Sequence, residues 1–128
     1  MILRMCLKGG EKLKVREVIK EKTGYCIKST SILNQTFLRS SLAAETGRNS
    51  NEIFEFIGDH VLSFYVVKLV SEKCGSLSTT TCDYTFRIRE NKFTQIKQTM
   101  LSNQTLAEII DDWDIAKYLL LSKSDIKN

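Results

Sequence analysis

Proline is absent from the 128-residue sequence, and long apolar runs are absent as well. Because proline breaks helices and fixes turns, a chain without it favours helices joined by turns of Gly, Ser and Asn. The longest apolar stretch, residues 61–70, is interrupted by Ser63 and Lys68 and is too short for a membrane span. Residues 1–7 are too few and too polar for a secretory signal. The sequence therefore predicts an all-α domain that does not enter a membrane.

Cysteine pairs at metal-ligand spacing are also missing. The four cysteines stand at positions 6, 26, 74 and 82, with no Cys-x-x-Cys pair. We interpret them as free thiols in a reducing cytoplasm, with a zinc or disulfide arrangement as the alternative.

The excess of positive charge is small, since 19 Lys and Arg against 15 Asp and Glu leave a net charge of +4. This balance is compatible with a polyanionic partner but does not demand one.

Three acidic residues fall on one face of a predicted helix over residues 51–74. Glu52, Glu55 and Asp59 are three, four and seven positions apart, so at about 100° per residue they share a narrow face. The other positions are apolar on nearly every side, a pattern typical of a buried helix. Buried carboxylates repel one another and are costly to desolvate, and a hard divalent cation such as Mg²⁺ would offset that cost. The alternative is a solvated acidic stripe, with Glu52 in a capping box with Asn49.

The pattern around these acids resembles the signature helix of the ribonuclease III family. The family usually reads Asn-Glu-Arg-Leu-Glu-Phe-Leu-Gly-Asp-x-Val-Leu, and residues 51–62 read Asn-Glu-Ile-Phe-Glu-Phe-Ile-Gly-Asp-His-Val-Leu. Ile53 and Phe54 depart from the usual Arg and Leu, and His60 falls at a position that the family varies. The match is specific because it is long and keeps acidic, aromatic and Gly positions in register. Gly58 costs a helix about 1 kcal/mol relative to Ala and indicates close approach of a neighbouring backbone.

Other segments continue the resemblance from about Lys14 to the last residue. Helical periodicity predicts helices at residues 13–23, 93–101 and 105–112. The segments that resemble the family are Phe37-Leu38-Arg39-Ser40-Ser41, Met100-Leu101-Ser102-Asn103-Gln104-Thr105-Leu106-Ala107 and Tyr118-Leu119-Leu120-Leu121. By resemblance, Arg39 lies at the polar end of the first segment, where the family's His is absent. Arg39 then contacts phosphate or bonds the carbonyls at a helix C-terminus.

Basic residues concentrate after a Ser- and Thr-rich loop predicted at residues 75–84. Residues 86–89 alternate between apolar and basic, which predicts either a short strand or the start of a helix. Arg87, Arg89, Lys92 and Lys97 form the densest basic segment and interleave with aromatic side chains. Such a segment can hold a nucleic-acid backbone, and it can equally be a solvated helix face. The loop is longer than in typical bacterial ribonuclease III.

The resemblance implies a fold and an activity. The fold is the all-α ribonuclease III endonuclease domain, incomplete at its C-terminus, over residues 13–128, and a basic arm of residues 1–12 precedes it. The family cuts double-stranded RNA in RNA processing by Mg²⁺-dependent phosphodiester hydrolysis, and Mn²⁺ can substitute. By resemblance, Glu55 and Asp59 are the catalytic, metal-holding residues, and Glu52 is an outer metal ligand or an RNA-positioning group.

The resemblance also implies partners. The expected assembly is a cytoplasmic homodimer in which the aromatic residue of the signature helix, here Phe56, fills a socket on the partner. Two catalytic centres then face one RNA duplex, and no organic cofactor is needed. The candidate RNA contacts are Arg39, Arg87, Arg89 and Lys92.

The second half of the family's acidic centre has no counterpart here. In the family, a following helix carries an Asp and a Glu within Asp-x-x-Glu-Ala-x-x-Gly-Ala, a pattern that this sequence lacks. Glu108, Asp111, Asp112 and Asp114 lie in an earlier segment and are not that pair. The family's double-stranded-RNA-binding domain is absent too. Three alternatives remain: part of an endoribonuclease, an inactive module that dimerises or binds duplex RNA, and a helical interaction domain without metal or RNA.

Overall fold

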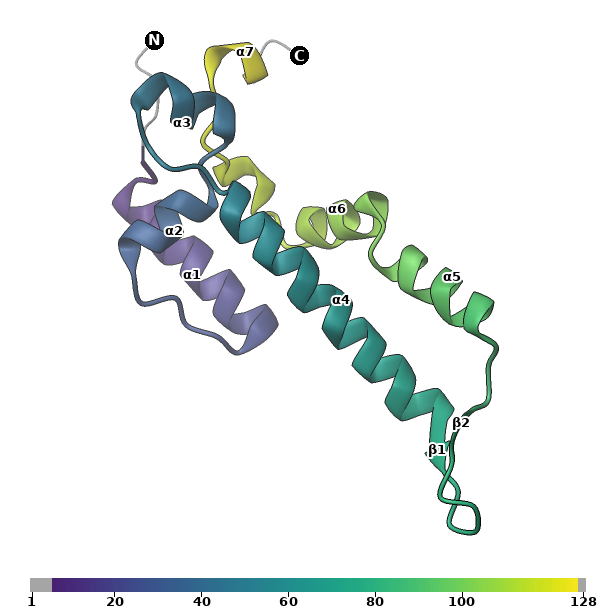
Figure 1. The fold of residues 1–128 in the computed structure, drawn as a ribbon. Coiled ribbons are helices and arrows are strands. Elements are labelled where there is room, and N and C mark those ends of the chain that lie inside the picture. The colour runs from purple at the N-terminus through teal and green to yellow at the C-terminus, as the bar shows by residue number, and fades with distance from the viewer. Residues whose placement is uncertain (1–5, 127–128) are drawn as a thin grey trace. The chain divides into compact units, whose positions relative to one another are not determined.

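The computed structural model describes residues 6–126, and helices dominate it (Figure 1). In chain order the elements are α1 (Gly9–Thr23), α2 (Thr30–Thr36), α3 (Ser40–Thr46), α4 (Glu52–Cys74), β1 (Gly75–Leu77), β2 (Tyr84–Phe86), α5 (Glu90–Met100), α6 (Asn103–Asp112), the 3-10 helix η1 (Ala116–Tyr118) and α7 (Lys123–Ile126). The predicted all-α class is confirmed. Within the described part, none of the helices combines the length and apolar character needed to cross a membrane.

The described chain divides into two compact units. The first unit comprises residues 6–56 and 110–126, and the second comprises residues 57–109. Helix α4 belongs to both, because the boundary falls between Phe56 and Ile57.

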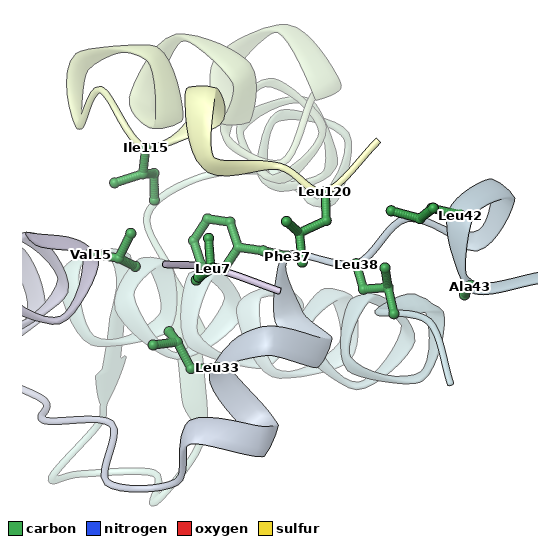
Figure 2. Packing of buried hydrophobic residues seen from close by; sticks show 9 residues of the cluster. All are labelled: Leu7, Val15, Leu33, Phe37, Leu38, Leu42, Ala43, Ile115 and Leu120. Carbon is green, nitrogen blue, oxygen red and sulfur yellow. The ribbon is translucent and has the colours of Figure 1, made fainter. Parts of the chain in front are cut away.

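Nine buried apolar side chains form the core of the first unit (Figure 2). They are Leu7, Val15, Leu33, Phe37, Leu38, Leu42, Ala43, Ile115 and Leu120. Leu120 lies far along the chain from Leu38, yet the two residues form an isolated parallel bridge. The Leu120 amide donates to the Phe37 carbonyl at 2.8 Å, and the Arg39 amide donates to the Leu120 carbonyl at 3.2 Å. The segment at residues 37–41 is therefore held directly by the C-terminal part of this unit.

Two helices of the first unit differ from their predicted bounds. Helix α1 begins at Gly9 instead of residue 13, and the buried Leu7 precedes it with its amide donating to Asn34 Oδ1 at 3.2 Å. Residues 1–5 of the predicted arm lie outside the described residues. Helix α3 was not predicted, because its seven residues are too few to show a clear period. It ends at Gly47, whose φ of 64° is a left-handed conformation that suits glycine.

The second unit contains a short hairpin where the sequence predicted a loop. Strands β1 and β2 pair antiparallel, with Gly75 opposite Phe86 and Leu77 opposite Tyr84. The loop prediction was wrong for β1 and for Tyr84, because strands of three residues are too short for an alternating pattern to stand out. The strand alternative for residues 86–89 meets β2 only at Phe86. A Cβ atom on Gly75 would collide with the Tyr84 ring, so close packing restricts this position to glycine. Helices α5 and α6 confirm the periods predicted for residues 93–101 and 105–112.

Helix α4 is far more exposed than its apolar sequence predicted. Val66 and Val70 are its only buried residues in the described structure. Its exposed apolar side chains are Ile53, Phe56, Ile57, Val61, Leu62, Phe64, Tyr65 and Leu69. The prediction of a buried helix was wrong, because these eight apolar side chains are between 42% and 63% exposed. A Cβ on Gly58 would meet no described atom within 4 Å, so the close backbone neighbour predicted there is not found among the described residues.

Candidate functional site

All three acidic residues of the predicted site lie on α4 and are exposed to solvent. Glu52 starts the helix, and its Oε2 accepts a hydrogen bond from the Ser50 hydroxyl at 3.1 Å. The Ser50 hydroxyl in turn accepts from the Glu52 amide at 3.3 Å. This reciprocal pair with Ser50 takes the place of the expected capping box with Asn49. Because the Glu52 carboxylate is hydrogen-bonded at the start of its own helix, it is the least available of the three carboxylates to a ligand.

Glu55 and Asp59 lie one helical turn apart and make no side-chain hydrogen bond or ion pair with any described residue. Both carboxylates are exposed, so the predicted cost of desolvating them does not arise, and that step of the sequence analysis was wrong. Oxygen donors of this kind suit Mg²⁺, which keeps several waters and needs only one or two carboxylates. No group of three or more His, Cys, Asp or Glu residues within the described chain converges on a metal position. The residues present therefore fit a partial site for a hydrated cation.

A hollow of about 340 Å³ within the second unit adjoins Asp59. Its lining residues are Asp59, His60, Leu62, Ser63, Leu101, Asn103 and Leu106. The volume lies at the lower end of the range of about 300–1,000 Å³ that small-molecule sites occupy. The sequence analysis missed Ser63 and Asn103 as neighbours of Asp59. The segment around Asn103 resembles a segment of the family, and this resemblance was the sequence feature that could have pointed to Asn103 as part of the site.

The basic residues predicted to contact RNA have different local roles. Arg87 caps α4, because its guanidinium donates to the Lys73 carbonyl and its amide donates to the Cys74 carbonyl at 2.7 Å. Arg89 is the N-cap residue of α5, and Lys92 lies in the first turn of that helix; both side chains are exposed. Arg87, Arg89 and Lys92 therefore belong to one short segment. Arg39 belongs to the other unit, where it is the N-cap residue of α3.

A second polar cluster, centred on Asp125, was not predicted. The Asp125 carboxylate accepts hydrogen bonds from the Ser41 hydroxyl, from the Ser122 amide at 3.1 Å and from the Ser122 hydroxyl at 3.0 Å. These bonds, above all the one from Ser41, lower the pKa of Asp125 below its ordinary value. The Ser-x-x-Asp spacing of residues 122–125 was the signal, because this spacing favours a side-chain cap at a helix start.

Comparison with known proteins decides the family. Residues 52–128, which include α4 and everything after it, match the family model described as the Ribonuclease III domain. The chain belongs to the ribonuclease III family. A comparison of this ribonuclease III chain with solved structures gave no significant match.

Three relatives illustrate the likeness of this ribonuclease III chain to curated proteins. It is 36% identical over 121 residues to Ribonuclease 3 of Roseburia hominis, covering 85% of this chain and 34% of the relative. It is 29% identical over 111 residues to Ribonuclease 3 of Treponema succinifaciens, covering 86% and 30%. It is 29% identical over 116 residues to Ribonuclease 3 of Hahella chejuensis, covering 88% and 43%. The chain thus spans less than half the length of these relatives.

Proposed function

We propose that this chain supplies one half of the acidic centre of a metal-dependent endoribonuclease that cuts double-stranded RNA. The observation that carries the proposal is the pair Glu55 and Asp59, exposed and unengaged one turn apart on the helix that bears the family signature. Carboxylates left free in this way are available to a ligand from solution. The family membership and the Ribonuclease 3 relatives support the same activity.

The residues of α4 have a defined part in this chemistry. Glu55 and Asp59 hold a Mg²⁺ ion, with Mn²⁺ as a substitute, and Glu52 acts as an outer ligand or positions the RNA. When bound, such an ion lowers the pKa of a coordinated water and neutralises charge that develops on the phosphate. Helix α4 keeps both carboxylates at a fixed spacing of one turn, so they are neighbours on one face of the helix.

The RNA is held mainly through its backbone. Arg89 and Lys92 are exposed near the start of α5, and Arg87 precedes them in the same segment. Arg39 offers a further cation from the first unit. Cations bind phosphate without reading bases, and a duplex of RNA is recognised chiefly by shape. We therefore expect little base specificity in the duplex contact.

The assembly that we propose is a homodimer. Phe56 is 62% exposed, and it belongs to the solvent-exposed apolar surface of α4. Gly58 adds support, because a helix-interior glycine with open space beside it leaves room for a partner's backbone. The resemblance assigns Phe56 to a socket on the partner. We place this dimer in the cytoplasm, because four cysteines without a Cys-x-x-Cys pair favour a reducing compartment.

Cleavage of a labelled duplex RNA in the presence of Mg²⁺, resolved on a gel, tests the proposed activity. Hydrolysis requires a cation fixed rigidly enough to aim a water at the phosphate, which half of a ligand set does not achieve. We predict that the 128 residues alone cut very slowly or not at all. A chain that also carries the family's second acidic helix should cut, and Asp59→Asn should slow it by about 100-fold or more.

Glu45→Gln is the matched control, because Glu45 is an exposed acid on α3 outside the site and its removal should leave cutting unchanged. If the 128 residues alone cut strongly and this cutting depends on Asp59, the proposal that the chain holds only one half of the acidic centre is wrong. Asp111, Asp112 and Asp114 would then be tested as the other half. If the longer chain binds duplex RNA but never cuts it, the endonuclease proposal is wrong and the inactive module is favoured.

A further inference from the structure

The hairpin of the second unit presents an aromatic surface to solvent. We propose that Tyr84, Phe86 and Phe93, with the cations Arg89 and Lys92, form a stacking surface for unpaired RNA bases; we name it the hairpin surface. Its choice of RNA rests on the proposed function, and it adds a single-stranded substrate feature to that function. Tyr84 is 55% exposed and Phe86 is 42% exposed. Neighbouring exposed rings on a small hairpin are typical of an interaction surface.

The rings of the hairpin surface are held in fixed orientations. Tyr84 and Phe86 are two residues apart on β2 and therefore project from the same face of the hairpin. Their ring centroids are 5.2 Å apart in an edge-to-face arrangement, and Phe86 makes a second such contact with Phe93 at 5.8 Å. The Tyr84 hydroxyl donates to the Ser71 carbonyl at 3.2 Å, which anchors this row of rings to α4. Rings that are already oriented lose little conformational entropy when a base stacks on them.

A small apolar hollow adjoins these rings. It measures about 260 Å³, and Phe86, Ile88, Glu90 and Phe93 line it. This volume is below the roughly 300 Å³ at which sites for drug-sized molecules begin, so the hollow suits one flat ring system. It is too small for the side-chain row of a docking helix. The size therefore favours a single base over a protein partner.

The charges around the hairpin surface complement a nucleic-acid backbone. Arg89 and Lys92 are exposed and adjoin in sequence Glu90 and Phe93, which line the hollow, and Arg87 adds a third cation within the same six residues. Asp83 and Glu90 are the only acids between positions 75 and 92. Aromatic rings beside exposed cations are the combination that binds single-stranded nucleic acid, because bases stack on rings while cations follow the phosphates. A duplex hides its base faces, so the rings select unpaired bases.

Binding of a labelled oligouridine, which cannot pair with itself, tests this inference by fluorescence anisotropy. EDTA is present, so binding is measured without cutting and without help from Glu55 or Asp59. We expect the 128-residue chain to bind oligouridine and Phe86→Leu to weaken that binding at least about fivefold. Phe86→Leu keeps an apolar side chain and removes the ring, so it should leave binding to a blunt RNA duplex within about twofold. Tyr25→Leu is the matched control, because Tyr25 is an aromatic residue of the first unit that is 67% exposed, and removing its ring should leave oligouridine binding unchanged.

A second variant keeps the test decisive if Phe86→Leu does not fold. Arg89→Gln combined with Lys92→Gln leaves every ring in place, and it should lower the slope of log affinity against log salt by about 1.4 for the single strand. The inference is overturned if the wild type does not bind oligouridine, or if the double variant binds it with an unchanged salt slope. It is also overturned if a folded Phe86→Leu variant binds as the wild type does or loses duplex binding equally. None of these binding measurements involves RNA cleavage, so the proposed stacking surface and the proposed endonuclease activity can each be disproved independently.

Discussion

Asp125 joins two segments of the first unit that are 84 positions apart in sequence. Its carboxylate accepts from Ser41 in α3 and from Ser122 just before α7. All these donors favour the charged form, so the pKa of Asp125 is lowered from its ordinary value of 3.8. A lowered folded-state pKa means that the cluster adds stability above the unfolded-state pKa. That stability is lost as the pH falls through the lower, folded-state pKa.

Asp125→Asn should therefore lower the melting temperature at neutral pH, and the difference from wild type should shrink as the pH falls below about 4. Thermal melts followed by circular dichroism between about pH 7 and pH 2.5 measure this. Asp111→Asn is the matched control, because Asp111 is exposed and its side chain makes no hydrogen bond or ion pair with a described residue. A difference between Asp125→Asn and wild type that stays constant over the whole range would contradict the assigned pKa direction.

Helices whose apolar residues recur at a regular helical spacing were predictable from sequence, and elements without such a spacing were not. Helices α5 and α6 were found because their apolar residues recur at helical spacing. Helix α4 was found through both its signature and its length. Helix α3 and strand β1 were missed, because seven-residue and three-residue elements carry little periodic signal. The exposure of α4 was mispredicted, because periodicity tells which face is apolar but not what covers it.

The exposed surface of α4 leads to a prediction about assembly. Phe56→Ala should shift the protein toward monomer, because truncating a buried interface aromatic typically costs at least about 2 kcal/mol of binding. Analytical ultracentrifugation over a range of concentrations measures the shift. Leu13→Ala is a suitable control, because Leu13 is similarly exposed, at 61%, but lies on α1. A wild-type chain that stays monomeric at high concentration would refute Phe56 as an intersubunit contact.

At the scale of the whole molecule, the family was predictable from sequence while the complete site was not. Residues 51–62 carry enough fixed positions to identify the family, and the family match over residues 52–128 confirms it. The same residues placed Glu52, Glu55 and Asp59 on one helix, as α4 bears out. A full metal site needs ligands from several elements, and the described chain brings no third His, Cys, Asp or Glu together with Glu55 and Asp59 at a metal position. Ser63 and Asn103 were missed beside Asp59 because only the fold brings them together.

Binding of Mn²⁺ to the 128-residue chain, followed by the relaxation of water protons, tests the central claim most directly. Two exposed carboxylates one turn apart should recruit a hydrated ion weakly, and added Mg²⁺ should compete with it. We predict that Asp59→Asn and Glu55→Gln each abolish this binding, while Glu45→Gln leaves it unchanged. Identical Mn²⁺ binding by the wild type and Asp59→Asn would contradict the assignment of the metal to this face of α4.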